Sequence, residues 1–261
     1  MITFVLMIDT HSHIFDEAFD ADRAQVIARA VEAGVELMVM PAIDSQSYAR
    51  MFEVARCYPN CRPTIGLHPT SINENPRYKE ELSLVRTIAR NSPCPLVAIG
   101  EVGLDLHWSS DFLAQQQYAL CYQIELALEL KLPLILHTRQ AWEPTFEILD
   151  NYDTACGVFH SFSGEAESWR RIEPMNFYVG IGGSVTYKKS LLPKILPQIP
   201  LERILLETDA PYLTPQPYRS ERNESCHLNI VAARIAQIKG VTLEQVQHVT
   251  TQNARRLFNL R

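Results

Sequence analysis

The sequence predicts an α/β fold, a (β/α)8 TIM-type barrel that forms a single domain over residues 1–261. Eight short apolar segments alternate with longer amphipathic segments. The short segments are rich in Val, Ile and Leu and do not alternate strictly with polar residues, which is typical of parallel strands covered on both faces. The length also fits, because such a barrel needs about 250 residues.

The eight expected strands are short and apolar. In chain order they read FVLMID, ELMVMPA, RPTIGL, LVAIGE, LPLILH, ACGVFH, FYVGI and RILLET, at residues 4–9, 36–42, 62–67, 96–101, 132–137, 155–160, 177–181 and 203–208. Because helical patterns separate them, the strands are expected to pair in parallel and to close into a barrel.

The first clear helix signal covers residues 20–34, DADRAQVIARAVEAG. Asp20 or Asp22 stands where an N-cap is expected, and Gly34 stands where the helix should stop. This segment should therefore connect the first two strands.

Two further helices are marked by their ends. Residues 111–131 carry an apolar stripe, and Asp111 is the expected N-cap. Residues 242–260 open with Thr242 and Gln245, which have the spacing of a capping box. The second of these helices closes the chain.

The overall composition excludes several classes of protein. The net charge is −6 and the pI is about 5.8, which argues against a broad basic surface that coats duplex DNA but leaves room for a small anion site. The six cysteines form no C-x-x-C pair, as expected of a cytoplasmic protein. We expect no signal peptide, no membrane span and no membrane partner; either Met1 or Met7 can be the start, and a monomer is plausible.

Polar side chains stand where six of the expected strands end. The residues are His11 and His13, His68, Glu101, His137, His160 and Asp209. In a barrel these ends meet at one rim, and residues two apart on a strand, such as His11 and His13, face the same way. Burying imidazoles and carboxylates together costs roughly several kcal/mol of free energy for each unpaired ion, unless a counter-charge is present. The sequence therefore predicts divalent metals at this rim.

The number of ligands predicts two metal ions, Zn, Mn or Mg. One ion would be held by His11, His13, Glu101 and Asp209, and the other by His137, His160 and a shared Glu101. A bridging carboxylate would keep the ions about 3.5–4 Å apart and allow a two-metal-activated water to act as nucleophile. Glu101 and Asp209 are the expected catalytic carboxylates, with Asp209 taking the proton of the water.

Eight motifs along the chain resemble the TatD family of metal-dependent hydrolases, a branch of the amidohydrolase-like barrels. They are IDTHSH, GLHP, AIGEVGLD, LELKLPLILHTR, FHSFSG, GIGGSVTYKKS, LLETDAPYL and TTQNARRLF, which run from residue 8 to 258. The resemblance implies a TIM-type barrel, a two-metal site made of the same six ligands, and phosphoester hydrolysis that typically removes nucleotides from DNA ends. Single strands or ends of DNA are thus the expected substrate and partner.

Three further residues near these motifs each have two interpretations. His68 contacts a phosphate or leaving group, or it is a structural histidine. Glu207, a third candidate catalytic residue, orients a ligand or water, or it fills the barrel as a hydrogen-bonded polar group. Asp105 holds a ligand histidine by its other nitrogen, or it caps a turn.

Basic residues in the loops above the rim are candidates for binding substrate phosphates. They are Arg139, Lys188, Arg219 and Arg222. The alternative for each is a solvated surface position. Departures from the family pattern, such as His107 and Gln140, concern the loops and leave the expected metal ligands in place.

Competing functions remain open at this stage. A related barrel hydrolase would act on an amide, a lactone or an aminoacyl ester, but several such enzymes use a carbamylated lysine on strand four, where this chain has Glu101. A third possibility is a metal-binding partner protein without catalysis. Cleavage of single-stranded DNA, and not of a model lactone or amide, would distinguish these functions.

Overall fold

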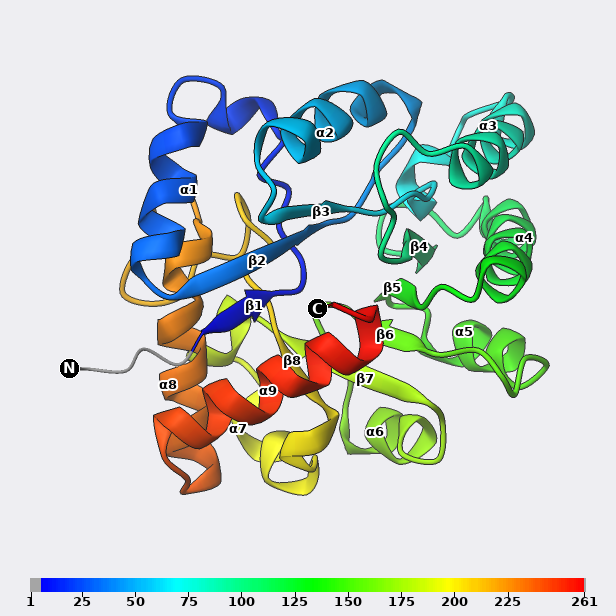
Figure 1. The fold of residues 1–261 in the computed structure, drawn as a ribbon. Helices are drawn as coiled ribbons and strands as arrows, with labels where there is room; N and C mark the ends of the chain where they lie inside the picture. The colour runs from blue at the N-terminus through cyan, green and yellow to red at the C-terminus, as the bar shows by residue number, and fades with distance from the viewer. Residues whose placement is uncertain (1–5, 261) are drawn as a thin grey trace.

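The computed structural model describes residues 6–260, and in that part of the chain eight parallel strands form a ring with helices outside it (Figure 1). The strands are β1 (Met7–Asp9), β2 (Val35–Met40), β3 (Cys61–Pro63), β4 (Ile99–Asp105), β5 (Leu134–Arg139), β6 (Gly157–Phe159), β7 (Phe177–Ile181) and β8 (Ile204–Leu206). All eight expected strands are thus present, although residues 4 and 5 of the first lie outside the described residues.

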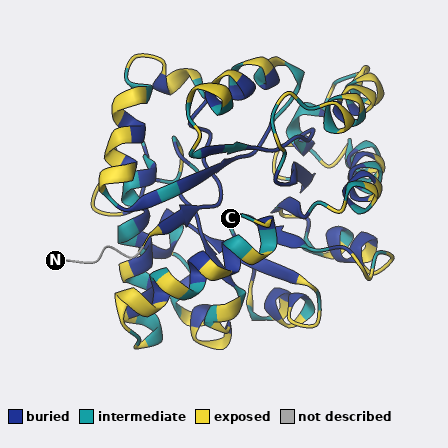
Figure 2. Ribbon diagram, viewed as in Figure 1, coloured by how far each residue is buried: buried dark blue, intermediate teal, exposed yellow. Residues whose placement is uncertain are grey.

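The helices alternate with the strands. They are α1 (Arg23–Glu32), α2 (Ser45–Cys57), α3 (Tyr78–Arg90), α4 (Leu113–Leu130), α5 (Trp142–Leu149), α6 (Ala166–Ile172), α7 (Leu192–Ile195), α8 (Leu228–Lys239) and α9 (Leu243–Phe258). Figure 2 shows their buried faces against the strands and their exposed faces toward solvent. One large apolar core fills the space between this outer layer and the strands.

The strands pair as two parallel sheets, in the orders β1-β2-β3 and β4-β5-β6-β7-β8. The edges of the two sheets meet at two seams. At one seam the Thr10 amide donates to the Leu206 carbonyl at 3.0 Å. At the other, the Gly100 amide donates to the Ile65 carbonyl at 2.8 Å. The predicted TIM-type barrel is confirmed, and β3 and β8, which border the seams, are shorter than predicted.

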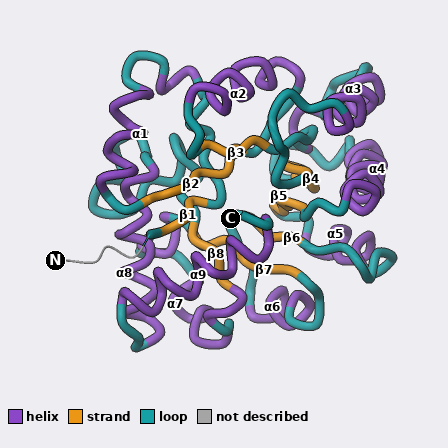
Figure 3. The backbone as a smooth tube through the Cα atoms, viewed as in Figure 1, coloured by secondary structure: helices purple, strands orange, loops and turns teal. Residues whose placement is uncertain are grey.

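A second apolar cluster fills the inside of the barrel. It contains side chains from most of the strands, among them Ile8, Val39, Ile135 and Leu205, together with Phe258 of α9. Figure 3 shows α9 crossing in front of the ring of strands. The amino-terminal end of the barrel is therefore covered, and the opposite end is left for polar side chains.

The predicted end of the fourth strand is wrong. The sequence pattern ended this strand at Glu101, but β4 continues through Gly103 to Asp105. A Cβ on Gly103 would lie 1.9 Å from the carbonyl oxygen of His137 on β5. Glycine permits close approach of two strands here, and it does not interrupt the strand.

The predicted helix ends are partly confirmed. The capping box of Thr242 and Gln245 is present at α9, and Gly34 follows the end of α1 with φ +88°. Asp22 occupies the N-cap of α1 without a side-chain capping bond. The prediction for Asp111 is wrong, because α4 begins after Phe112; the Asp111 amide instead bonds to the Ser109 hydroxyl.

In residues 6–260 none of the helices has the length and apolar character needed to cross a membrane. The six cysteines are all free thiols.

Candidate metal centre

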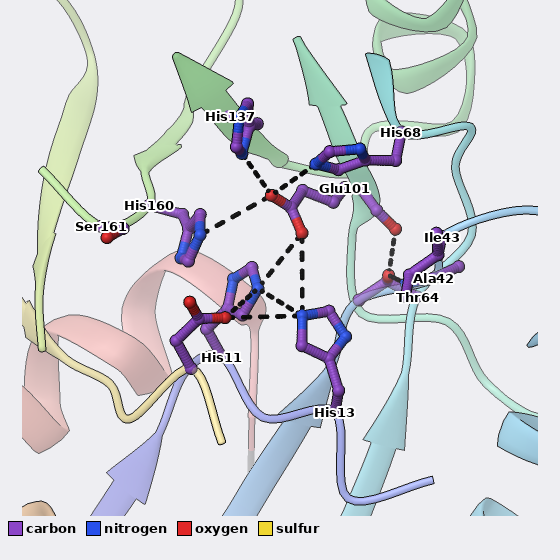
Figure 4. A network of polar contacts seen from close by, with 12 residues as sticks. His11, His13, Ala42, Ile43, Thr64, His68, Glu101, His137, His160 and Ser161 are labelled. Atoms are coloured by element: carbon purple, nitrogen blue, oxygen red, sulfur yellow. Dashed lines mark hydrogen bonds and ion pairs between the residues drawn. The ribbon is translucent and has the colours of Figure 1, made fainter. Parts of the chain in front are cut away.

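The predicted strand-end side chains converge at the carboxyl end of the barrel (Figure 4). Glu101 and His137 project from β4 and β5, whereas the others follow strands directly or within a few residues. His11, His13, Glu101 and His160 are buried, and Asp209 is 14% exposed. Residues separated by up to 198 positions in sequence, from His11 to Asp209, therefore share one small volume, as the sequence predicts.

The two carboxylate oxygens of Glu101 face two different groups of imidazoles. Oε1 lies 2.8 Å from Nδ1 of His137, 3.3 Å from Nε2 of His68 and 3.6 Å from Nε2 of His160. Oε2 lies 3.2 Å from Nε2 of His11 and 3.9 Å from Nε2 of His13. One carboxylate thus divides the cluster into two halves (Figure 4).

Asp209 completes the half that contains His11 and His13. Its Oδ1 lies 3.6 Å from Nε2 of His11 and 3.5 Å from Nε2 of His13. The two Nε2 atoms are themselves 3.2 Å apart. Asp209 adopts a left-handed backbone with φ +60°, and its amide donates to the His11 carbonyl at 2.8 Å. The connection between β1 and β8 therefore fixes the carboxylate beside both histidines.

The donor set fits divalent cations. Three groups of ligand atoms lie close enough to share an ion: His11, Glu101 and His160; His11, His13 and Asp209; and His68, Glu101 and His137. Imidazole nitrogens and carboxylate oxygens, with no thiolate among them, suit Zn, Mn or Mg. The Nε2 atoms of His11 and His13 point at each other and at carboxylate oxygens. The lone pairs of these atoms repel one another unless protons or cations lie between them.

The electrostatics of the site also favour bound positive charge. Burial alone would raise the pKa of Glu101, but the charges of His68, His160 and His11 outweigh burial and hold this pKa well below its usual range. Burial likewise opposes ionisation of His160, yet Glu207 and Glu101 raise its pKa to about 10. The carboxylates therefore stay ionised and attract counter-charge, as protons or as metal ions.

Two further carboxylates each contact a histidine at the ring nitrogen that does not face Glu101. Glu207 Oε1 accepts from the Ser161 amide at 2.6 Å and lies 3.2 Å from Nδ1 of His160. Asp105 Oδ2 lies 2.9 Å from Nε2 of His137, and its Oδ1 accepts from the His107 amide at 2.9 Å. Asp105 therefore fits both interpretations, because it contacts a histidine and also caps a turn.

Asp9 is a buried carboxyl group that the strand-end pattern did not predict. It accepts from the Thr208 hydroxyl at 2.6 Å and from the Thr208 amide at 3.0 Å. Burial raises its pKa to about 7, although hydrogen bonds from Thr208, Ser225 and the His11 backbone lower it. The bonds of Asp9 to Thr208 connect β1 to the segment after β8. The position of Asp9 within the IDTH motif, two residues before His11, is the sequence feature that could have indicated this residue.

The predicted substrate-binding residues occupy different environments. His68 belongs to the cluster through Glu101. Arg139 is exposed at the end of β5, with its guanidinium 5.7 Å from the Trp108 ring. Lys188 is exposed in the loop after β7.

Arg222 is already engaged within the protein. Its guanidinium lies 2.7 Å from Asp22 and 3.0 Å from Glu224, donates to the Ala18 carbonyl and stacks on Phe19. The structure thus places Arg222 where it fastens the loop after β8 to α1, and it does not bring this residue into the cluster.

Comparisons with known proteins agree with this arrangement. The profile of the family described as TatD related DNase matches residues 8–259. The "Uncharacterized metal-dependent hydrolase YabD" of Bacillus subtilis strain 168 is 38% identical over 98% of this chain and 100% of its own length. The "3'-5' ssDNA/RNA exonuclease TatD" of Pantoea ananatis is 36% identical over 97% of this chain and 100% of its own length.

A solved structure shows the same fold. The crystal structure of YjjV, a TatD homolog from Escherichia coli K12, superposes with a TM-score of 0.92 at 29% identity and covers 99% of this chain and 100% of that one. The family match spans every residue of the cluster from His11 to Asp209. This chain therefore belongs to the TatD related DNase family and is a metal-dependent hydrolase of that family.

Proposed function

We propose that the protein hydrolyses phosphodiester bonds at single-stranded ends of DNA, with two divalent cations held at the carboxyl end of the barrel. The observation that carries this proposal is that the two oxygens of the Glu101 carboxylate face separate sets of imidazoles. A carboxylate in this position suits a bridging ligand, and a pair of metals is a common arrangement in enzymes that cleave phosphate esters.

The proposed ligands form two sets that share Glu101. His11, His13 and Asp209 surround Oε2, and His137 and His160 surround Oε1. His68 lies on the Oε1 side as well, as a further ligand or as a contact for the leaving group. Zn, Mn and Mg all fit these donors.

When bound, the cations would supply Lewis-acid polarisation of the phosphate and lower the pKa of water at the site. The carboxylate of Asp209 is ionised, because His13, His160 and His11 outweigh burial and lower its pKa. An ionised carboxylate at this position could accept the proton of the attacking water. Glu207 would keep the His160 ring in place, and Asp105 would do the same for His137.

The choice of substrate rests on the relatives and on charge. Relatives at 36% identity, from Pantoea ananatis and Cronobacter sakazakii, are named as exonucleases for single-stranded DNA and RNA. This chain has a net charge of −6, which disfavours a long duplex and favours a local contact with a strand end. The free thiols accord with our proposal that the protein is cytoplasmic. A monomer is sufficient for the proposed activity.

The proposal is tested by incubating the metal-loaded protein with a labelled single-stranded oligonucleotide. We expect nucleotides to be removed from one end, with at least about a hundredfold loss of rate in Glu101→Ala, because both ligand sets lose their shared carboxylate. Removal of metal with a chelator should abolish cleavage, and added Zn or Mn should restore it.

A model lactone, an amide and an aminoacyl ester serve as controls. Hydrolysis of one of these in preference to DNA would replace the nuclease by the related C–O or C–N hydrolase. Undiminished DNA cleavage in both Glu101→Ala and His160→Ala would mean that the cluster is not the active site, and the proposal would be withdrawn.

A further inference from the structure

A groove of about 690 Å³ lies beside the metal centre, between the loops that follow β6, β7 and β8. We call it the cationic groove and define it by Ser163, Ser184, Tyr187, Lys188, Lys189 and Arg219. Its volume is within the range of pockets that bind small organic ligands. It is therefore large enough for at least one nucleotide unit.

The charge of the groove is opposite to that of the molecule. Lys188, Lys189 and Arg219 line it together with neutral residues, and no carboxylate is among the lining residues. In residues 6–260, no salt bridge joins any of these three cations to a carboxylate, whereas Arg222, only three positions after Arg219, contacts Asp22 and Glu224. Three cations that pair with no carboxylate of the described residues, in an acidic protein, are available to bind an anion from outside.

Arg219 is held in position before any ligand arrives. Its guanidinium carbon lies 3.8 Å from the centre of the Tyr187 ring, and the Tyr187 hydroxyl donates to the Thr214 carbonyl at 3.0 Å. The Gln216 amide donates to the Thr186 hydroxyl at 2.9 Å and so joins the same two loops. A side chain that is already fixed loses less entropy when it binds a ligand.

The groove adjoins the cluster described above. Ser163 stands two residues after Ser161, whose amide bonds to Glu207. Gly183, which precedes Ser184, packs against the Leu213 carbonyl just beyond Asp209. Burial raises the pKa of Tyr187, Arg219 lowers it, and the charge of Asp209 raises it further. The groove and the cluster therefore share the chain segments that follow β6 and β8, and we expect a strand bound at the metal centre to reach these cations.

We propose that the cationic groove binds the phosphodiester backbone of single-stranded nucleic acid and holds phosphates next to the one that is cleaved. This proposal rests on the proposed function of the metal centre. Because Arg219 covers one face of Tyr187, the pair presents charge to the ligand more than an open ring for base stacking. Lysine ammonium groups also bind phosphate as point charges, so the binding tolerates any base sequence.

The test is equilibrium binding of a fluorescein-labelled phosphorothioate oligonucleotide of eight thymidines to the metal-loaded, full-length protein. Phosphorothioate linkages resist hydrolysis, so that binding is measured without cleavage. We expect Arg219→Ala, and the double variant Lys188→Ala with Lys189→Ala, each to weaken binding about tenfold. For every phosphate that a variant no longer neutralises, the slope of log K against log salt should become shallower by about 0.7. Arg219→Lys should retain more of the affinity than Arg219→Ala.

Arg86→Ala is the matched control. Arg86 also stacks on a tyrosine, with its guanidinium carbon 4.7 Å from the Tyr122 ring, but it lies between α3 and α4 on the outside of the barrel. This variant removes the same charge and the same kind of stacking without touching the groove. It should leave both the affinity and the salt slope at the wild-type values.

Two outcomes overturn the groove proposal: unchanged binding in the groove variants, or an equal loss in Arg86→Ala. Failure of the nuclease proposal is distinguishable, because wild-type protein would then leave an ordinary oligonucleotide uncut while the binding measurements still report on the groove. Weaker binding in the groove variants alone supports the proposal, whatever the result for cleavage.

Discussion

Glu101 organises the cluster because its two oxygens contact different histidines, His11 on one side and His137 on the other. Its burial would be costly for a lone carboxylate. The surrounding imidazoles and the cations proposed here compensate this cost. The convergence of these side chains was predictable from sequence, since strand ends of a barrel meet at one rim.

Asp105 supplies the most specific prediction for a single residue. Asp105→Asn keeps the side-chain volume and the bond from the His107 amide but removes the charge that faces Nε2 of His137. We expect the affinity for Zn to fall by about 10–100-fold, as for other groups that orient a metal ligand. Calorimetric titration of the metal-free protein with Zn measures this change.

Asp111→Asn is the control, because Asp111 is exposed in the segment that precedes α4. It should leave the affinity for Zn at the wild-type value. If Asp105→Asn binds Zn as tightly as the wild type, Asp105 does not position a ligand.

The contacts of the long basic side chains were less predictable from sequence than the convergence of the strand-end histidines and carboxylates. Arg219 and Arg222 stand in the same short loop, yet one faces a groove and the other is bound to Asp22 and Glu224. Their difference depends on α1, which lies about two hundred residues away in sequence. Flexible side chains on loops find their partners only in the folded structure.

At the scale of elements, β4 shows how glycine sets the geometry of the site. Gly103 has φ +147°, and a Cβ there would meet the His137 carbonyl. Gly103→Ala should therefore lower the free energy of unfolding by about 3 kcal/mol or more. It should also weaken metal binding, because His137 moves with β5. Chemical denaturation and metal titration measure the two effects.

Comparison with Gly240→Ala separates the cost of backbone strain from the cost of steric crowding at Gly103. Gly240 follows α8 with φ +67°, and nothing lies within 4 Å of a Cβ built there. The expected loss is about 1 kcal/mol, from the left-handed conformation alone, with metal binding unchanged. Equal losses in the two variants would mean that the close approach of β4 and β5 is not critical.

The element boundaries were harder to predict than the elements themselves. Apolar composition identified all eight strands, but a glycine in a strand and a glycine in a turn look alike in sequence. The strand containing Glu101 was therefore ended too early. Asp111 was likewise expected as an N-cap because an acid preceded an apolar stripe, but α4 begins two residues later.

At the scale of the whole molecule, the two ends of the barrel have separate tasks. Phe258 of α9 is 3% exposed and packs among the side chains that fill the barrel. Phe258→Ala should lower the free energy of unfolding by about 3–5 kcal/mol through the cavity it leaves. Metal affinity of the folded protein should stay unchanged, since the cluster lies at the opposite end.

Leu243→Ala is the matched change on the same helix, at a position that is 40% exposed. It should cost less than about 1 kcal/mol in unfolding free energy, measured by the same chemical denaturation. A similar cost for both variants, or loss of metal binding in folded Phe258→Ala, would contradict this division of the barrel.

The central claim, that Glu101 separates two cation sites, is tested most directly by anomalous diffraction from metal-loaded crystals at the Zn and Mn absorption edges. We predict two peaks on opposite sides of the Glu101 carboxylate. One should lie among His11, His13 and Asp209, and the other beside His137 and His160. A single peak, or peaks away from these side chains, would contradict the claim.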